Sequence, residues 1–421
     1  MQSGGRDDGW MGMSIVKATT PRIWVLVSQK PGDNNQSIAL ATAIGLPYLV
    51  KRLDWPADEG GEKRLCDALL ADTVEAGYAR RRLGIAKPWP DAMICCGRRG
   101  ERFALWIKRQ ADGKSKIFKI GRASYSLEHY DLLIATPQFP VPPLSNVVSL
   151  RFPPVREGEG STIELSKAGG IKDVLSSFSK PWFAILVGGE VRHFSPSARR
   201  LRGVAHKIQS AADLSGGSVL ISTSRRTPPE MLSAITSGLT GMQYLYCWSP
   251  QDAEMNPYLT LLRKSAAVFV TADSVSMMMD ASRLGTPTFI IELPQRFSRR
   301  ALWELCFHRT LMSAAAWAGR HGGTEIAHRL YLFLDWMHAR RFARFPKDIS
   351  RLHEALYASG LARPASEFDP SVVPARSEFR RIGVRELEDA AARCRDLLAP
   401  LQAGAPALSS GVAECIIPSS A

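Results

Sequence analysis

One stretch of the chain, residues 266–292, has the pattern of two strands that flank a helix. Ala266–Val270 is a short apolar run, typical of a strand buried in a parallel sheet. A helix is expected over about Val275–Leu284, because Gly285 can take the positive φ that ends a helix. Thr288–Ile291 is the second strand. A strand–helix–strand unit of this kind predicts an α/β protein with parallel strands.

The turn after the first of these strands is a candidate phosphate site. In a parallel unit it opens onto a helix N-terminus, where free amides and a positive partial charge favour anions. Asp273, Ser274 and Ser276 occupy this turn and the start of the helix. Asp280 lies one to two turns further on, where a carboxylate can accept hydrogen bonds from a ribose while the amides hold a diphosphate. These residues favour a nucleoside diphosphate as the ligand.

Further strands alternate with helices along the chain, which favours a doubly wound parallel sheet. The first strand, Arg22–Val27, is followed by the polar turn Ser28–Gln36 and by a helix that ends at Gly45. This turn lacks the three glycines of a dinucleotide fingerprint, so no nicotinamide cofactor is expected.

The segment Pro90–Arg99 repeats the same pattern. Its apolar strand is followed by Gly97 and by two arginines, Arg98 and Arg99. Guanidinium groups bind anions through paired donors, so the two arginines could clamp an anionic ligand. They could equally form a solvated basic turn, and the sequence leaves both interpretations open.

A charged segment rich in proline and glycine, residues 152–161, divides the pattern into two halves. The second half begins with the strand Trp182–Val187, and the glycines Gly188 and Gly189 after it let the backbone approach a ligand closely. The expected parts are a disordered N-terminus (1–20), an N-terminal Rossmann-like domain (21–165), a C-terminal Rossmann-like domain (166–300), C-terminal helices (301–398) and a flexible tail (399–421).

The net charge of +14 indicates an anionic partner. Nucleic acid is not expected, because no tract of lysine and arginine is interleaved with aromatic residues. The seven cysteines are scattered and no cysteine–histidine set has zinc spacing, so we expect a reducing compartment and no metal site. No signal region is evident, and no apolar run reaches the ~18 residues of a membrane span. We expect a cytoplasmic protein, or one peripheral at the cytoplasmic face of the inner membrane.

The segment Arg329–Lys347 combines large apolar side chains with basic ones. Its arginines are Arg329, Arg340, Arg341 and Arg344. A basic helix with aromatic residues can lie on an anionic membrane. It can also pack its apolar face into the core and expose its basic face to water, and the sequence does not decide between the two.

Three motifs carry a closer resemblance: Thr223–Pro228 (Thr-Ser-Arg-Arg-Thr-Pro), Asn256–Tyr258 (Asn-Pro-Tyr) and Thr271–Met277 (Thr-Ala-Asp-Ser-Val-Ser-Met). Together they resemble the mitochondrial fission (elongated mitochondria) family and its bacterial relatives, which are described as GT-B glycosyltransferases. The segments Lys30–Gln36 and Pro90–Arg99 also fit this family.

This resemblance covers about residues 22–294 and implies a GT-B-type α/β fold. Two Rossmann-like domains would face each other across a cleft, with a nucleotide-sugar donor substrate on the second, the acceptor on the first, and no further cofactor. The implied donor-binding residues are Gly188, Gly189, Ser224, Arg225, Arg226, Asn256, Tyr258, Asp273, Ser274, Ser276, Met277 and Asp280. The implied acceptor- or anion-binding residues are Gly32, Asn35, Gln36, Gly97, Arg98 and Arg99.

Glycosyl transfer needs a stabilised leaving diphosphate and an acceptor hydroxyl made nucleophilic. The first task falls to helix N-termini and cations, here the helix start at Ser274 with Arg225 and Arg226. The second task falls to a general base, a carboxylate or an imidazole. Asp33 is the first candidate and His193 the second, although an aspartate at position 33 could instead cap the helix that follows.

The expected function is transfer of a sugar from a nucleotide-sugar donor to a lipid-linked or lipopolysaccharide-type acceptor at an anionic membrane surface. Two alternatives remain open. Plant members of the family are associated with recruiting a dynamin-related protein to mitochondria, so the chain could be a non-catalytic membrane adaptor. Nucleotide-sugar epimerases use the same two-domain fold. The sequence contains no Asp-x-Asp motif, so a metal is not implied. It does not identify the sugar, the nucleotide base, the acceptor, the stereochemistry of transfer or the oligomeric state.

Overall fold

The computed structural model describes residues 20–28, 30–53, 68–71, 73–155, 174–189, 194, 196–240, 243–249, 255–380 and 385–402. The predicted disordered N-terminus, apart from residue 20, lies outside these residues, as do His193 and the tail beyond residue 402.

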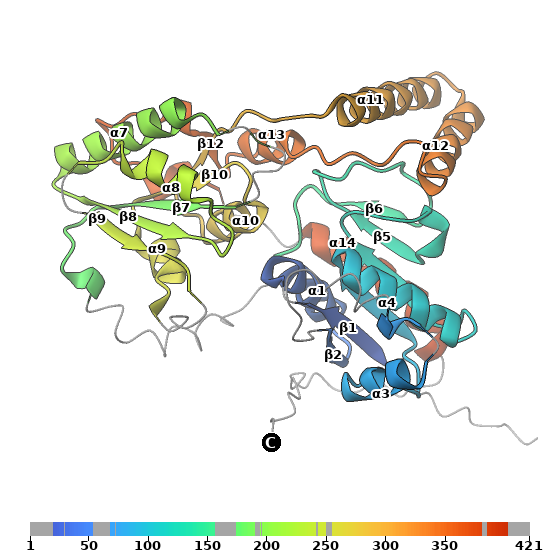
Figure 1. Ribbon diagram of the computed structural model, residues 1–421. Coiled ribbons are helices and arrows are strands. Elements are labelled where there is room, and N and C mark those ends of the chain that lie inside the picture. The colour runs from blue at the N-terminus through green and yellow to red at the C-terminus, as the bar shows by residue number, and fades with distance from the viewer. Residues whose placement is uncertain are drawn as a thin grey trace, which may run out of the picture.

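Two parallel six-stranded sheets form two α/β domains (Figure 1). The first sheet has the order β2-β1-β3-β4-β5-β6. Its strands are β1 (Ile23–Val27), β2 (Tyr48–Arg52), β3 (Ala92–Cys96), β4 (Lys116–Ile120), β5 (Leu132–Ala135) and β6 (Val147–Ser149). Every residue of β1 is buried, as expected for a strand covered on both faces of a parallel sheet.

The second sheet has the order β12-β11-β10-β7-β8-β9. Its strands are β7 (Trp182–Val187), β8 (Ser218–Thr223), β9 (Gln243–Tyr246), β10 (Ala267–Thr271), β11 (Thr288–Ile291) and β12 (Arg363–Pro364). The central strands β7 and β10 are buried throughout. The predicted α/β fold of the GT-B type, with two Rossmann-like domains, is thus confirmed by the strand order.

Helices connect the strands and continue beyond β11. In the first domain they are α1 (Pro31–Ile44), α3 (Val74–Arg82), α4 (Gly97–Gln110) and the 3-10 helix η1 (Leu127–His129). In the second domain they are α7 (Ala198–Ser215), α8 (Pro229–Thr236), α9 (Tyr258–Lys264) and α10 (Val275–Leu284). The last part of the chain holds α11 (Arg299–Arg320), α12 (Thr324–Ala339), α13 (Ser350–Ala358), the 3-10 helices η4 (Ala365–Glu367) and η5 (Arg376–Glu378), and α14 (Arg385–Gln402). Within the described residues, none of the helices is long and apolar enough to cross a membrane.

The start of α1 differs from the sequence prediction. The polar turn was expected to extend to Gln36, but the helix begins at Pro31. Proline fixes the φ of the first helical residue, and its missing amide hydrogen is no loss at that position. The Asn34 side chain then closes the short loop, since it accepts from the Ser28 amide at 2.8 Å and donates to the Ser28 carbonyl at 2.5 Å.

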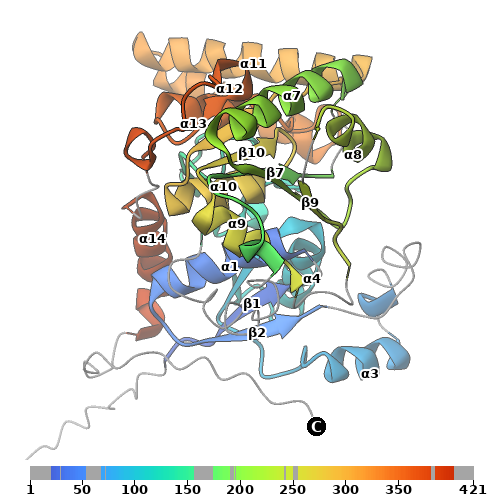
Figure 2. The same cartoon turned by 90° about the vertical axis from the view of Figure 1, so that its left-hand side faces the viewer.

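The last part of the chain passes back and forth between the two domains (Figures 1 and 2). After β11, the hairpin of α11 and α12 lies over the first domain, and Phe345 beyond it enters that domain's core. Helix α13 returns to the second core through Leu352 and Leu356. Helix α14 then packs Cys394 against α1, and Arg395 donates to the carbonyl of Ala43 at 2.9 Å. The segment predicted as C-terminal helices therefore links both domains.

One buried aspartate fixes the hairpin to the first domain. The Asp335 carboxylate on α12 accepts from the Ser126 hydroxyl at 2.7 Å and from the Leu127 amide at 2.9 Å. Both hydrogen bonds reach the start of η1, so Asp335 acts as a cap supplied by a distant segment of the chain.

We predict that Asp335→Ala lowers the free energy of unfolding by about 1–3 kcal/mol, because it leaves a buried amide without its acceptor. The control is Glu325→Ala on the same helix, which removes an exposed ion pair with Arg329 and should cost less than about 0.5 kcal/mol. Urea unfolding measures both, and equal effects would show that Asp335 does not anchor the hairpin.

Two buried histidines of the hairpin predict a pH-dependent stability. His308 and His338 are 2% and 5% exposed. Burial, with help from nearby positive charges, lowers the pKa of each to about 4. Between about pH 6.5 and 4 the unfolded chain therefore binds more protons than the folded chain, and stability decreases as the pH falls through this window.

The expected loss is on the order of 3 kcal/mol for each histidine, and it is complete once the pH is well below about 4. Urea unfolding at several pH values should show a shallower dependence for His308→Leu than for the unaltered protein. Replacing the exposed His328 of α12 by Gln should leave the dependence unchanged. An equally steep dependence in the His308 variant would contradict this assignment.

Candidate functional site

The order of each sheet changes direction at one pair of neighbouring strands. In the first sheet these are β1 and β3, and in the second sheet they are β7 and β10. Ligands of open α/β sheets bind beyond the carboxyl ends of such strands, where the two following loops diverge. The loops at these four strand ends lead to Gly32, Gly97, Gly188 and Asp273. Topology therefore brings the predicted loops to one location in each domain.

The two locations meet at the start of α1 and α10. A Cβ added to Gly32 would overlap the Oγ of Ser276, so the backbone of α1 touches the first turn of α10. Neither helix has a side-chain cap on its first amides. Two helix N-termini with free donors and positive partial charge thus face the same space. We call this place, defined by Gly32, Asp33, Ser274 and Ser276, the domain junction.

Asp33 lies on the first-domain side of the junction. It is half-buried in the first turn of α1 and is not the N-cap, which is Lys30. A Cβ added to Gly97 would overlap the Asp33 carboxylate, so this carboxylate lies against the start of α4. Gly97 also has a φ of 74°, which a residue with a side chain rarely adopts. The helix-capping role considered for Asp33 is therefore not the one it has.

The sequence analysis did not single out a buried lysine of the first domain, whose charge Asp33 influences. Lys119 on β4 is fully buried and donates to the carbonyl of Ile120 at 2.7 Å. Burial opposes its positive charge, but Glu101, with smaller contributions from Cys96, Cys95 and Asp33, outweighs burial and raises the pKa of Lys119. Glu101 is fully buried as well and accepts from the Ser124 amide at 2.8 Å. In the sequence, Lys119 could have been recognised as unusual because it lies within an apolar strand.

The two glycines after β7 are required by close packing. The Gly188 amide donates to Thr271 Oγ1 at 2.8 Å, and the Gly189 amide donates to the buried Asp273 carboxylate at 2.7 Å. A Cβ on Gly188 would lie 2.8 Å from Cγ of Asp273, and one on Gly189 would overlap the backbone of Arg226. These glycines therefore position the loops after β8 and β10, and their amides are already engaged.

The Asn256–Tyr258 motif positions Asp280. Asn256 accepts from the Tyr258 amide at 3.0 Å and so starts α9, while the Tyr258 hydroxyl donates to Asp280 Oδ2 at 2.8 Å. Burial raises the pKa of Asp280, and the Tyr258 hydrogen bond and Arg283 partly oppose this. Burial and then Asp280 raise the pKa of Tyr258. The carboxylate is thus held in one orientation on α10.

The other predicted donor-binding residues surround the same strand ends. Ser224 is half-buried after β8, where its amide donates to Thr227 Oγ1 at 2.8 Å, while Arg225 and Arg226 are exposed. Met277 is half-buried in the first turn of α10. His193, the second candidate base, lies outside the described residues.

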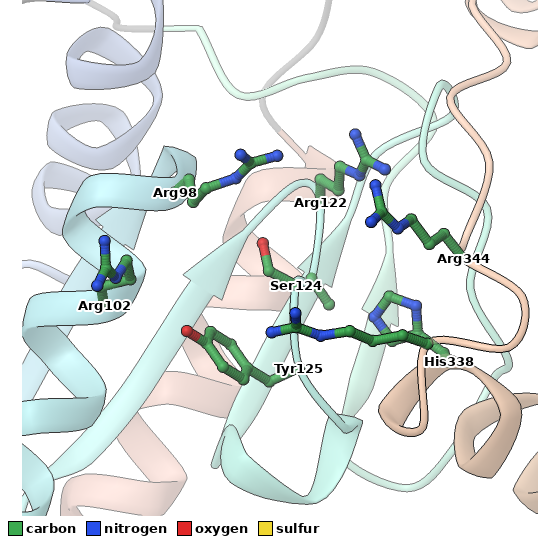
Figure 3. A pocket seen from close by; sticks show the side chains of 9 residues that line it. Arg98, Arg102, Arg122, Ser124, Tyr125, His338 and Arg344 are labelled. Atoms are coloured by element: carbon green, nitrogen blue, oxygen red, sulfur yellow. The ribbon is translucent and has the colours of Figure 1, made fainter. Parts of the chain in front are cut away.

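The predicted acceptor residues separate into two groups. Gln36 is half-buried, with its Oε1 4.0 Å from Cys96 Sγ, and Asn35 is exposed. Arg99 donates to the Leu53 carbonyl at 2.9 Å. Arg98 instead points into a neighbouring cavity (Figure 3). The paired clamp considered for Arg98 and Arg99 is therefore not formed.

This cavity contains Arg122, which the sequence analysis did not single out, and Arg344, which it considered only as part of the basic segment Arg329–Lys347. Arg122 follows Gly121 at the carboxyl end of β4, so the rule applied to the other strand ends would have found it. Arg344 follows α12 and reaches the cavity only because the hairpin folds back over the first domain. Within the described parts of the chain, no three His, Cys, Asp or Glu residues are grouped to hold a metal ion.

Two solved structures align with most of this chain at low sequence identity. The UDP-GlcNAc 2-epimerase of Neisseria meningitidis, bound to UDP-GlcNAc, is 11% identical with a TM-score of 0.43, over 90% of this chain and 100% of that chain. The MurG protein of Acinetobacter baumannii is 11% identical with a TM-score of 0.36, over 90% and 99%. Scores this low do not establish a common fold, so the fold assignment depends on the strand order.

Curated relatives are closer in sequence. The mitochondrial fission protein ELM1 of Arabidopsis thaliana is 26% identical over 260 residues, which are 56% of this chain and 59% of the relative. An uncharacterized protein of Rickettsia prowazekii is 25% identical over 305 residues, 65% of this chain and 83% of that protein. The chain thus spans somewhat more than half the length of the plant relative.

The model of one protein family, described as mitochondrial fission ELM1, matches residues 31–320. The match includes the domain junction, the Asn256–Tyr258 motif and the start of the α11–α12 hairpin. It covers more than half of the chain, and this chain therefore belongs to the mitochondrial fission ELM1 family.

Proposed function

We propose that this protein transfers a sugar from a nucleotide-sugar donor to a lipid-linked or lipopolysaccharide-type acceptor at an anionic membrane surface. The observation that carries the proposal is the domain junction, where the N-termini of α1 and α10 meet at the switch points of two parallel sheets. Two like partial charges held this close favour an anion between them. The diphosphate of a nucleotide sugar has the charge and the oxygen acceptors for this position.

The second domain provides side chains that can bind the ribose and the diphosphate of a nucleotide. Asp280 lies on the helix whose first turn carries Ser276, so a carboxylate is available near a diphosphate bound at the junction. Tyr258 holds one oxygen of Asp280, and the other can accept from a ribose hydroxyl. The exposed Arg225 and Arg226 can neutralise the leaving diphosphate.

The first domain supplies a candidate general base. Asp33 is half-buried at the junction, and its carboxylate lies against Gly97 rather than capping its own helix. A carboxylate at the meeting point of the two domains can take the proton of an acceptor hydroxyl as the diphosphate leaves. This role requires that the acceptor enters from the first domain.

The hairpin of α11 and α12 supports action at a membrane surface. Large apolar residues are 43–60% exposed on it and just after it, namely Leu302, Trp303, Trp317, Ile326, Leu332, Phe333, Trp336 and Phe342. Arg340, Arg341 and Arg344 are also exposed, and Arg340 lies 5.6 Å above the Trp336 ring. Aromatic side chains flanked by arginines are typical of a surface that lies on anionic lipid. The same surface suits a membrane adaptor, so the assays below also test that function.

We predict that Asp280→Asn weakens binding of a nucleoside diphosphate by about tenfold to a hundredfold, because a charge-assisted bond to the ribose is lost. Inorganic diphosphate, which has no ribose, should bind nearly as before. Tyr258→Phe should give a smaller loss, since it frees the carboxylate without removing it. A thermal-shift screen of nucleoside diphosphates identifies the base, and calorimetry then measures each affinity.

The matched control is Asp213→Asn, an exposed aspartate on α7 of the same domain. Unchanged nucleoside diphosphate affinity in Asp280→Asn would remove the main support for a donor site. With a panel of nucleotide sugars, released nucleotide indicates transfer or hydrolysis, an altered sugar indicates an epimerase, and no binding indicates an adaptor.

We predict that the protein binds vesicles containing anionic lipid more tightly than neutral vesicles, and that salt weakens this binding. Replacing Trp317, Trp336 and Phe342 together by Ser should reduce the binding by about tenfold or more, because these exposed aromatic side chains enter the interface. The control is Leu214→Ser, which removes a side chain that is 70% exposed on α7. Equal binding to neutral vesicles, or no effect of the triple variant, would contradict membrane docking through the hairpin.

A further inference from the structure

A cavity of about 520 Å³ lies between the first domain and the end of the α11–α12 hairpin. It is lined by Arg98, Arg102, Arg122, Ala123, Ser124, Tyr125, His338, Arg341 and Arg344 (Figure 3). Five of these residues are arginines, and within the described part of the chain no Asp or Glu lines the cavity. The volume is in the range of small-molecule sites in proteins.

The arginines come from three separate places in the chain. Arg98 and Arg102 lie on α4, Arg122 follows β4, and Arg341 and Arg344 follow α12. In Figure 3, Arg98 and Arg344 extend from opposite sides toward Arg122. Because the segments are far apart in sequence, their convergence is a property of the folded protein and not of one basic tract.

This convergence of like charges is unfavourable in the absence of a ligand. Burial lowers the pKa of Arg122, and the charges of Arg98 and Arg344 lower it further, while Glu101 and Glu304 oppose this shift more weakly. His338 adds no positive charge at neutral pH, because its pKa is about 4. An anion with several oxygens would relieve the repulsion and engage more than one guanidinium fork.

We propose that this cavity binds a phosphate group of the acceptor, a phosphomonoester or diphosphate carried by a lipid. The inference rests on the proposed function and deepens it, since it names the substrate class on the acceptor side. A phosphate offers up to two negative charges and three acceptor oxygens, which suit several arginines better than a single carboxylate does. The Ser124 and Tyr125 side chains are further hydrogen-bonding groups at the same cavity.

The surroundings of the cavity favour a phosphate that is attached to lipid. Phe342, between the two hairpin arginines in sequence, is 57% exposed, and its ring centroid lies 5.7 Å from that of Trp336. An apolar chain could follow these rings toward a membrane while the phosphate enters the cavity. On the other side, Arg98 directly follows Gly97, which lies against Asp33. A phosphate held here would bring the attached acceptor next to the candidate base.

The test compares two variants with the same change in charge. Arg122→Gln with Arg344→Gln alters the cavity, and Arg320→Gln with Arg329→Gln alters exposed arginines elsewhere on the hairpin. The first arm measures binding of full-length protein to vesicles with phosphatidic acid, a phosphomonoester lipid, against vesicles with phosphatidylglycerol at equal charge. We expect the unaltered protein to prefer phosphatidic acid, and the cavity variant alone to lose this preference by about tenfold or more.

The second arm uses inorganic diphosphate in solution and counts its binding sites by calorimetry. If both the cavity and the donor site bind it, the unaltered protein has two sites, and the cavity variant retains one, for which nucleoside diphosphate competes. One site in the unaltered protein and none in the cavity variant would support the cavity and oppose the donor site. Diphosphate binding with no preference for phosphatidic acid would identify a soluble phosphate as the ligand and overturn the lipid assignment.

Two outcomes would overturn the whole inference. The cavity variant would bind both probes like the unaltered protein, or the control variant would lose as much binding as the cavity variant. The single change Arg344→Gln provides a second test, because this exposed side chain can be replaced without disturbing the buried strands. It should reduce the preference for phosphatidic acid, and Arg344→Lys, which keeps the charge but loses the fork, should reduce it less.

Discussion

The contact between Gly32 and Ser276 is the constraint on which the arrangement of the two domains depends. Parallel strands place their carboxyl ends at one edge of each sheet, and this contact brings the two edges together. A side chain at position 32 would overlap the Ser276 hydroxyl, so one of the two groups would have to move. Because both termini carry a positive partial charge, their approach is unfavourable unless a negative group lies between them. Asp33 in the first turn of α1 is one negative group close to the junction, and the proposed diphosphate would be another.

The path of the chain holds the two domains together at the contact between Gly32 and Ser276. The hairpin is sequence-adjacent to the second sheet but bonded to the first domain through Asp335. Asp348 continues the connection, because its amide donates to the Gln138 carbonyl at 2.9 Å and its carboxylate accepts from Arg309 at 2.5 Å. Helix α14 then returns to α1. Repeated crossings limit how far the domains can separate, and they also place the exposed aromatic surface next to the arginine-lined cavity.

The sequence could predict those features that depend on local patterns. Continuous apolar runs identified the buried strands, and the rule for parallel strand ends correctly assigned the loops of Gly97, Gly188 and Asp273 to the carboxyl edges of the sheets. The failures involve contacts between distant segments. Arg99 was paired with Arg98, yet Arg99 donates to the Leu53 carbonyl and Arg98 lines the cavity. Arg344 belongs to the cavity only through the folding of the hairpin, which no periodicity reveals. Arg122 was within reach of the strand-end rule and was overlooked.

Two groups in unfavourable surroundings support the proposed ligand-binding function over that of an adaptor. An exposed aromatic hairpin alone would suffice for docking to a membrane. An adaptor has no need of Asp280, whose carboxylate is disfavoured by burial and oriented by Tyr258. It also has no need of arginines that converge on one cavity and oppose the charge of Arg122. Groups held in unfavourable surroundings are concentrated at functional sites, because the ligand supplies the compensating interaction. Asp280 belongs to the second domain and the cavity to the first, which matches the proposed donor and acceptor domains.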